Sequence, residues 1–289
     1  MLPTFAEHTR AASDKRLLHG RMSVETAMRL LLFGFVSTFL VCANAESLAV
    51  VPKKTIVLFN GKDFDGWYPY LRENKYKDPS HVFSIKDGMI RISGEEWGGL
   101  ATRNTYRDYH LIVEWKWGGA TWGERKDRAR DSGILVHGVG EDGAYGNVWL
   151  ESIESQVIEG GTGDFIMVGG KKKPSLTVDS VEIGGQHYWR ESGGTPKTLD
   201  SGRFNWYGRD PEWKDEIGFR GKQDVENPTG EWNRQEVICD HDQLTNILNG
   251  KAVNHAYKSS HTEGKIQLQS EGAEILIRRV ELQPLTKSP

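Results

Sequence analysis

The sequence predicts an all-β fold, a β-sandwich or jelly roll of two antiparallel sheets, on three observations. Short apolar segments recur along the chain with glycine-containing turns between them. After residue 46, no segment keeps the apolar period of a helix over about eleven residues. The chain has 33 glycines and 10 tryptophans, which fits strands joined by tight loops around an aromatic core. We therefore expect each sheet to bury one face and to keep the other polar.

Residues 1–45 have the pattern of a secretory signal peptide and are set apart from the fold. Arg21 and Arg29 precede the apolar run 30–41, and the A-x-A motif 43–45 follows it. The apolar run is short for a membrane-spanning helix, so we expect no membrane span after the leader is cleaved. The expected location is secreted or periplasmic.

The start and the end of this leader each have an alternative. A leader of ordinary length would begin at Met22 or Met28, which suggests a wrongly assigned upstream start. Cys42 suggests a lipoprotein, but the residue before it is a poor match for a lipidation site. Cleavage after Ala45 is therefore favoured, and residues 46–289 are expected to form a single domain.

The mature chain is acidic and nearly free of cysteine. Residues 46–289 carry 32 basic and 37 acidic side chains, so neither nucleic acid nor an anionic membrane surface is an expected partner. Cys239 is the one cysteine after the leader, and its apolar neighbours predict a small buried hydrophobe. Without a disulfide, the core alone must stabilise the protein.

The strands are predicted by apolar alternation and by the turns that follow them. Segment 55–59 ends at Asn60-Gly61, and segment 81–85 ends at Asp87-Gly88. Segment 109–117 alternates throughout, which predicts a strand with one buried face. The remaining strand-like segments are 89–93, 132–137, 152–158, 164–168, 175–183, 233–240, 244–250, 265–270 and 273–282.

Two stretches do not fit as strands. Residues 118–130 are predicted to form a basic loop, and residues 184–230 a long irregular insert that contains Trp189, Trp206 and Trp213. Long loops in compact domains are commonly functional, and tryptophans bring large apolar areas that prefer to pack. We therefore expect the insert to form a folded wall beside a cleft.

Three predicted strands place polar side chains opposite their core residues, because successive side chains of a strand point to opposite faces. The predicted core positions are Ile134, Val136, Ile153, Val157, Ile266 and Leu268. The polar side chains on the opposite faces are His137, Glu154, Gln156, Gln269 and Glu271. If these strands are neighbours in one curved sheet, their polar side chains line a concave ligand cleft.

Aromatic and cationic side chains near these strands would complete a sugar-binding surface. The candidates are Trp97, Arg103, Tyr145 and Trp149. Flat rings stack on the C–H faces of sugars, and fixed amides and carboxylates hydrogen-bond to their hydroxyls. Each residue taken alone has an ordinary explanation, since most charged strand residues are solvated and most tryptophans are core. A sugar-binding site is favoured because the polar residues are predicted to lie on the same face of their sheet.

Other chemistries lack their motifs. The sequence has no G-x-S-x-G nucleophile motif, no H-E-x-x-H zinc motif and no paired C-x-x-C. The glycines of 160–163 lack the Lys-Ser/Thr and the following helix of a phosphate-binding loop. No spacing of aspartates and histidines specifies a metal site, so the metal stays unknown.

Five stretches, in order across nearly the whole mature chain, resemble the 3-keto-disaccharide hydrolase domain family. They are LFNGKDFDGW (58–67), DSGILVHGVGEDG (131–143), SIESQVIEGGTGDF (152–165), GEWNRQEVICDHDQLTNILNGKAVNHA (230–256) and GKIQLQSEGAEILIRRVEL (264–282). The resemblance implies a concanavalin A-like sandwich with a sugar cleft on its concave sheet. It also implies a glycoside or disaccharide substrate with a glucose unit oxidised at the 3-hydroxyl. The family's motifs correspond to Glu154 and Gln156, to Gln269–Glu271, and to 132–137, which ends at His137.

The resemblance implies elimination chemistry. A conventional glycosidase needs two carboxyl groups across the scissile bond. The partner of Glu154 would be expected four positions later on the same face of the strand, but that residue is Ile158. A 3-keto group acidifies the C2–H, so one base can remove that proton and expel the C1 substituent, and water added to the enone gives net hydrolysis. Glu154 is expected as the base and His137 or Glu271 as the acid. Gln156 or a divalent cation would stabilise the enolate oxygen.

Two alternatives to this reading stay open. A non-catalytic, lectin-like carbohydrate-binding module would use the same sheet, but it would bind unoxidised sugar as well and release no aglycone. A conventional glycoside hydrolase is the third possibility, and Ile158 disfavours it.

We predict that the mature protein begins at Glu46, because the A-x-A motif ends at Ala45. N-terminal sequencing of the exported protein tests this directly. A lipid-modified Cys42 at the N-terminus would contradict the prediction.

Overall fold

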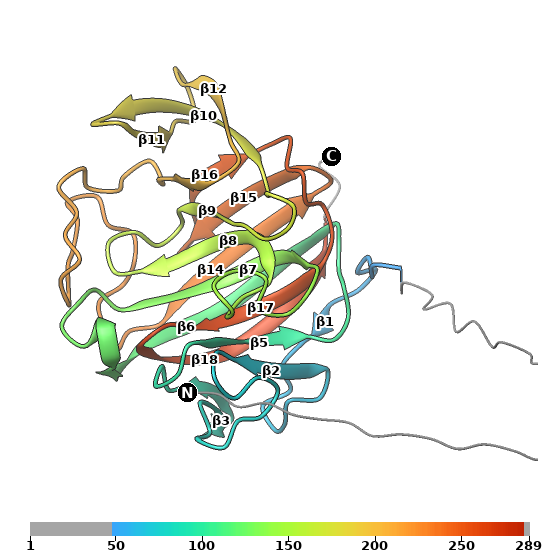
Figure 1. The fold of residues 1–289 in the computed structure, drawn as a ribbon. Helices are drawn as coiled ribbons and strands as arrows, with labels where there is room; N and C mark the ends of the chain where they lie inside the picture. Colours follow the sequence, from blue (N-terminus) through green and yellow to red (C-terminus); the bar gives the residue numbers. More distant parts are fainter. Residues whose placement is uncertain (1–47, 286–289) are drawn as a thin grey trace, which may run out of the picture. The chain divides into compact units, whose positions relative to one another are not determined.

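Two large antiparallel sheets form the framework of residues 48–285, the part of the chain described by the computed structural model (Figure 1). The predicted leader and its cleavage site lie outside these residues. The eight-stranded sheet consists, in spatial order, of β16 (Lys251–Ala256), β15 (Gln243–Leu248), β14 (Asn233–Asp240), β6 (Tyr109–Thr121), β18 (Ala273–Pro284), β4 (Met89–Ile92) and β3 (Phe83–Lys86), with β1 (Ile56–Val57) paired to β18. The predicted all-β class is confirmed.

The second sheet has seven strands. In spatial order they are β13 (Gly202–Phe204), β9 (Phe165–Val168), β8 (Glu151–Ile158), β7 (Asp131–Val139), β17 (Lys265–Ser270), β5 (Gly98–Thr102) and β2 (Trp67–Leu71). All strand pairs in both sheets are antiparallel. The three strands predicted to carry polar residues are neighbours, in the order β8-β7-β17.

The core is one cluster of apolar side chains contributed by both large sheets. Trp115 and Trp117 of β6 are buried in it, as their alternation predicts. The six core positions predicted on the other sheet are all buried in the same cluster: Ile134, Val136, Ile153, Val157, Ile266 and Leu268. Each sheet therefore turns one face toward the other, as in a sandwich.

The insert 184–230 contains more regular structure than predicted. A small sheet in the order β11-β10-β12 joins β10 (Leu176–Ile183), β11 (Gln186–Trp189) and β12 (Thr195–Leu199) beside β16 (Figure 1). Gly184 and Gly185 both have positive φ, the backbone of a tight hairpin turn. The prediction was wrong here because β12 is almost fully exposed and shows no apolar alternation. Residues 205–232 contain no strand longer than an isolated bridge.

The predicted basic loop 118–130 begins later than expected. Strand β6 continues to Thr121, and a single turn of 3-10 helix, η1 (Gly123–Arg125), follows it. Within residues 48–285 there is no helix long and apolar enough to cross a membrane.

Buried acidic side chains attach the irregular part of the insert to the sandwich. Glu226 accepts hydrogen bonds from Trp117 Nε1 at 2.7 Å and Thr162 Oγ1 at 2.9 Å. Asp164 accepts from the backbone N–H of Trp206 at 2.8 Å and pairs with Arg209. These contacts support the expectation that the insert is a folded wall.

We predict that Glu226→Gln makes stability less dependent on pH. Burial, with the Asp224 carboxylate nearby, raises the pKa of Glu226 from its ordinary 4.5 to about 8. Between these values the folded protein holds a proton that the unfolded chain releases, so this group makes the free energy of unfolding fall as pH rises. Glutamine has no such proton, so the fall should become shallower by at most ~1.4 kcal/mol per pH unit.

Denaturant unfolding between about pH 5 and 8 measures this slope. Glu263→Gln, at a side chain that is 58% exposed, serves as the control and should leave the slope as it is. An unchanged slope in Glu226→Gln would contradict the prediction.

Candidate functional site

Polar side chains meet on the face of β8, β7 and β17 that points away from the core. Across β7 and β8, Gly133 pairs with Gln156 and Leu135 pairs with Glu154. Paired residues of antiparallel strands point to the same face, and β17 continues the arrangement so that Gln269 lies beside Gly133. We call this surface the polar face.

Gly133 leaves the space in which two of these side chains approach each other. A Cβ at this position would overlap Glu154 Oε1 and Gln269 Oε1. The glycine is therefore required by the close approach of the two side chains, and any larger residue would push them apart.

Asp131 and Glu271 join Glu154 in a cluster of three carboxyl groups on the polar face. Asp131 lies two residues before Gly133 on β7, and Glu271 lies two residues after Gln269, so alternation points both toward Glu154. Strand geometry thus gathers three acidic side chains from sequence positions far apart. We call this group the carboxyl cluster.

Burial and mutual repulsion favour the protonated forms of the carboxyl cluster. Burial and then the Asp131 carboxylate raise the pKa of Glu154, and burial raises the pKa of Asp131. Burial raises the pKa of Glu271 well above its ordinary value, with Asp131 and Glu154 adding to the effect. Arg125 opposes this, since its Nη2 contacts Asp131 and lies 3.9 Å from Glu271 Oε1.

Three such carboxyl groups do not all ionise at neutral pH. The carboxyl cluster therefore retains a proton there, so one member can donate a proton while another accepts one. An acid and a base are thus available without a histidine.

Several buried atoms of the polar face have no hydrogen-bond partner within the described chain. They are Asp131 Oδ1, Glu154 Oε1 and both amide atoms of Gln269. Buried polar atoms are normally paired, and an unpaired one costs about 1–3 kcal/mol. Donors and acceptors gathered in this way match a ligand that carries many hydroxyl and carbonyl groups.

The polar face is more covered than the sequence predicts. Glu154 and Gln156 are each 4% exposed and Gln269 is fully buried. The segment around η1 and the insert meet above the carboxyl cluster, where Arg125 Nη1 lies 3.0 Å from Asp215 Oδ1. Alternation shows on which face a side chain lies, but it does not show what covers that face.

His137, predicted as an acid, lies in the core and not with Glu154. A β-bulge between Val136 and Val139 shifts the register, and His137 has a left-handed φ of 55°. Its ring packs edge-on against Tyr109 at 5.7 Å, and Nδ1 lies 2.9 Å from the carbonyl oxygen of His261. Burial lowers the pKa of His137 to about 4, so the ring is neutral at pH 7.

The predicted aromatic platforms stack on one another. The ring of Trp149 is stacked with Trp97 at 5.6 Å and with Tyr145 at 6.1 Å. Trp149 is 6% exposed and donates to the carbonyl oxygen of Gly98 at 2.9 Å, while the Arg72 guanidinium covers Trp97 at 4.5 Å. Of the three rings, Tyr145 is the most exposed, at 46%, and Trp97 is half-buried.

Arg103 lies at the opposite end of the same sheet from the carboxyl cluster. It follows β5 and shares a cleft with Lys265, the first residue of β17. The structure therefore brings Glu154, Gln156, Gln269 and Glu271 together but leaves His137 and Arg103 outside the group.

Sequence reasoning missed three side chains of this site. Asp131 could have been found by extending the alternation of Leu135 and Gly133 by one step. Arg125 was inside the predicted basic loop and Asp215 inside the predicted insert, but no pattern connects either residue to the polar face. Their positions depend on how the two segments pack over the sheet.

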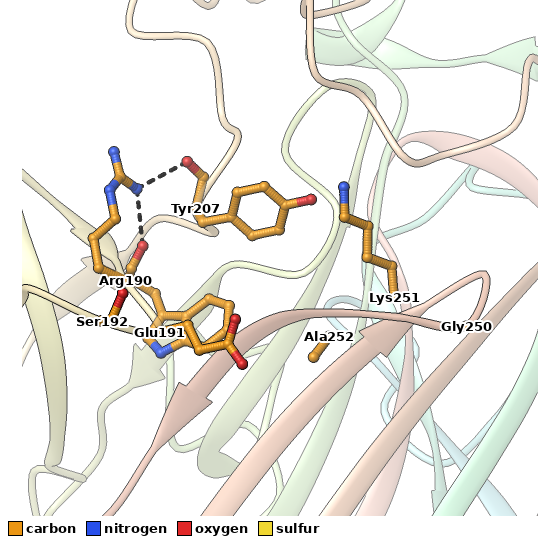
Figure 2. Close-up of a pocket in the computed structure, with 8 residues that line it drawn as sticks. Arg190, Glu191, Ser192, Tyr207, Gly250, Lys251 and Ala252 are labelled. Carbon is orange, nitrogen blue, oxygen red and sulfur yellow. Dashed lines mark hydrogen bonds between the residues drawn. The ribbon is translucent and has the colours of Figure 1, made fainter.

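A separate cleft of about 550 Å³ lies between β11 and the turn from β15 to β16 (Figure 2). Arg190 Nη1 donates to the carbonyl oxygens of Trp189 and Tyr207, both at 2.9 Å. Lys251 Nζ lies 4.9 Å from the centre of the Tyr207 ring. Arg190 therefore connects two parts of the insert, and Lys251, the first residue of β16, contacts the insert through the Tyr207 ring.

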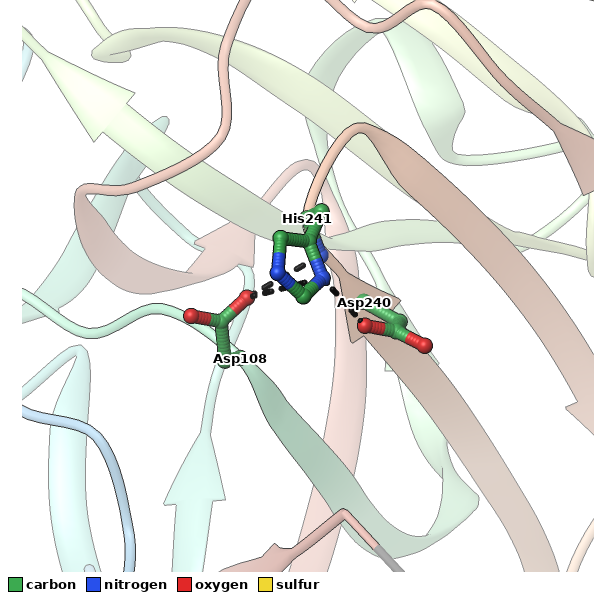
Figure 3. A group of neighbouring side chains, drawn as sticks. All are labelled: Asp108, Asp240 and His241. Carbon is green, nitrogen blue, oxygen red and sulfur yellow. Dashed lines mark hydrogen bonds and ion pairs between the residues drawn. The ribbon is translucent and has the colours of Figure 1, made fainter. Parts of the chain in front are cut away.

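Within residues 48–285, one group of side chains has metal-ligand spacing: Asp108, Asp240 and His241 (Figure 3). The chain already satisfies these groups, since Arg107 Nη1 lies 2.6 Å from Asp108 and His241 Nδ1 lies 2.6 Å from Asp240. The group lies where β6 begins and β14 ends, in the other sheet. In the described chain, the carboxyl cluster does not reach this spacing, and Arg125 supplies the positive charge beside it.

A two-sheet sandwich with carboxyl and amide groups gathered on one strand face is the arrangement of a carbohydrate-active protein. The chain belongs to the 3-keto-alpha-glucoside-1,2-lyase-like domain family, which matches residues 54–283. The family suspected from the sequence motifs is thereby confirmed. No curated protein sequence matches the chain.

Solved structures with similar folds include carbohydrate-related proteins at low sequence identity. A Parabacteroides distasonis protein provisionally described as a glycosyl hydrolase is 20% identical, with a TM-score of 0.47 over 82% of this chain and 99% of that one. A Bacillus licheniformis β-glucanase is 10% identical, with a TM-score of 0.41 over 81% and 99%. The Bacillus subtilis carbohydrate-binding module CBM66 is 11% identical, with a TM-score of 0.39 over 75% and 94%.

We predict that Trp149 is a structural residue. Trp149→Ala should lower the free energy of unfolding by about 3–5 kcal/mol, because it removes a buried ring and its hydrogen bond to Gly98. Tyr145→Ala, at the exposed end of the same stack, should cost less than about 1 kcal/mol. Denaturant unfolding of both variants measures the difference, and equal small losses would show that Trp149 is not part of the core.

Proposed function

We propose that the protein cleaves the glycosidic bond of 3-keto-glycosides or 3-keto-disaccharides by β-elimination, with or without rehydration. Membership in the family supports the substrate class. The observation that carries the proposal is the carboxyl cluster, in which burial favours a retained proton beside a carboxyl able to accept one. This arrangement suits a reaction that removes one proton and donates another.

The reaction begins with Glu154 as the base. It removes the C2 proton, which the C3 ketone makes acidic, and the electron pair moves onto O3 as an enolate. The enolate then expels the C1 substituent, so the C1–O bond breaks and its electrons leave on the aglycone oxygen. Glu271 donates a proton to that oxygen. The product is a 3-keto sugar with a C1–C2 double bond, and adding water as hydroxyl to C1 and proton to C2 gives net hydrolysis.

Amide groups are suited to stabilise the enolate at O3. Gln156 Oε1 already accepts the backbone N–H of Val157 at 2.9 Å, which leaves its NH₂ group as a donor. Gln269 has no partner for either amide atom within the described chain. A preorganised donor in a dry site stabilises developing negative charge at little cost of reorganisation.

Exposure favours Glu271 over Glu154 as the acid. The side chain of Glu271 is 12% exposed, and the neighbouring Arg125 and Asp215 are 16% and 32% exposed. Glu154 is 4% exposed. The leaving group is therefore best placed at the Glu271 end, where it can depart into solvent, while the sugar ring lies over Glu154.

A conventional glycoside hydrolase is the second candidate, because of one observation. The sequence argument against it was the missing partner for Glu154, yet Asp131 and Glu271 provide carboxyl groups on the same face. Such an enzyme would cleave unoxidised glycosides and would not exchange the C2 hydrogen. A binding module would cleave neither substrate. The three functions thus differ in outcomes that one assay can separate.

We predict that Glu154→Gln abolishes cleavage of a 3-keto-aryl glucoside and leaves the fold intact. Glutamine keeps the shape of the side chain but cannot accept the C2 proton, so turnover should fall by at least about 10²–10⁴-fold. The melting temperature should change little, because glutamine keeps the shape and the packing of the buried Glu154 side chain. The rate at which wild type and variant release the phenol leaving group measures the effect.

Glu236→Gln is the matched control, since Glu236 is a buried glutamate on β14 of the other sheet, bonded to His110. It should keep normal turnover.

In deuterated water, wild-type enzyme that also rehydrates its product should place deuterium at C2. Normal turnover in Glu154→Gln, or hydrolysis that never exchanges C2, would reject elimination with this base.

A further inference from the structure

Residues 141–150 divide the polar face of the seven-stranded sheet into two parts. Leu150 packs against Tyr68 and Ala101, and its backbone N–H donates to Gln267 Oε1 at 3.1 Å. Gln267 lies on β17 between Lys265 and the site residue Gln269. The carboxyl cluster lies at one end of β17, and a second group of polar residues lies beyond the crossing segment at the other end.

Two adjoining clefts occur in this second part, with volumes of about 420 and 380 Å³. Both are lined by Arg103 and Lys265, which therefore form a wall common to the two. Tyr68, Tyr76 and Asp142 line the first cleft, and Glu263 lines the second. We call the pair the Arg103–Lys265 cleft.

Neither cation of this wall is neutralised by a carboxylate of the described chain. Lys265 Nζ donates to the Tyr68 hydroxyl at 2.5 Å, and the Arg103 guanidinium lies 5.5 Å from the centre of the Tyr68 ring. No ion pair and no side-chain hydrogen bond of Arg103 is formed among residues 48–285. The planar donor fork of the arginine therefore remains available to a ligand.

The acidic residues of the cleft have other partners. Asp142 accepts from the Tyr68 hydroxyl at 2.7 Å and from the Tyr76 hydroxyl at 2.9 Å, one on each carboxylate oxygen. Burial raises the pKa of Tyr68, so this phenol remains a donor at neutral pH. Glu263 is 58% exposed and lies 3.7 Å from Arg107. Asp142 lies in the same cleft as the two cations, but both of its oxygens are occupied by tyrosine hydroxyls and it forms no ion pair with either cation.

Aromatic surface adjoins the cations. Tyr76 is 61% exposed, and the centre of its ring lies 6.2 Å from that of Tyr68. A guanidinium binds a carboxylate or sulfate through two parallel hydrogen bonds, and an ammonium adds a point charge. An exposed phenol ring offers a flat face to the C–H side of a pyranose.

We propose that the Arg103–Lys265 cleft is a second binding site, for an acidic saccharide. The carboxylate of a uronic acid or the sulfate ester of a sugar binds Arg103 and Lys265, and its pyranose ring lies against Tyr76. This site is separate from the carboxyl cluster and does not depend on the cleavage reaction proposed above.

The test is a binding titration of the purified protein with methyl glucuronide, glucose 6-sulfate, methyl glucoside and inorganic sulfate. At least one acidic sugar should bind at least tenfold more tightly than methyl glucoside, and added NaCl should weaken its binding. The tighter of the two acidic sugars identifies the anionic group. Equal binding of methyl glucoside would overturn the proposal, and inorganic sulfate binding as tightly as the acidic sugars would overturn the sugar part of it.

Variants locate the binding. Arg103→Met and Lys265→Met should each weaken the acidic sugar at least tenfold, since each removes charge-assisted hydrogen bonds but keeps an apolar stem. Arg107→Met, at the neighbouring ion-paired arginine, is the control and should bind normally. Unchanged binding in both cleft variants would place the ligand elsewhere. Glu154→Gln should also bind normally, which separates this result from the fate of the cleavage proposal.

Discussion

The ion pair between Arg125 and the buried Asp131 is the contact on which the arrangement of the polar face depends. Burying three carboxyl groups in one place is costly unless a positive charge accompanies them. Arg125 supplies that charge from above the sheet, and Asp215 of the insert holds its other side. The guanidinium therefore connects sheet, η1 segment and insert in a single set of contacts.

The same contact explains why the carboxyl cluster is reactive as well as buried. If the arginine neutralised all three groups fully, each carboxyl would ionise and none could donate a proton. Arg125 contacts Asp131 directly but lies 3.9 Å from Glu271, and among the described residues Glu154 forms no ion pair. The positive charge is thus shared unevenly across the cluster, so its members differ in their environments and need not ionise together.

The sequence predicted the fold class, most strand positions and the facing of the core residues, because period-two alternation reports directly on burial. It also predicted that Glu154, Gln156 and Gln269 share a face, since that inference needs only alternation and adjacent strands. It failed for His137, where a β-bulge breaks the alternation, and for β12, whose exposed residues lack it. It could not predict Arg125, because loop packing decides that position.

The order of strands has a consequence for how this protein is made. In the seven-stranded sheet β17 lies between β7 and β5, and in the eight-stranded sheet β18 lies between β6 and β4. Both interior strands follow all the other strands of their sheets in chain order, so they emerge after them during synthesis. A nascent chain that has reached β16 thus carries unpaired strand edges at the middle of both future sheets, a state prone to aggregation. Folding of both sheets should await β17 and β18, with the slow kinetics expected of such distant pairings.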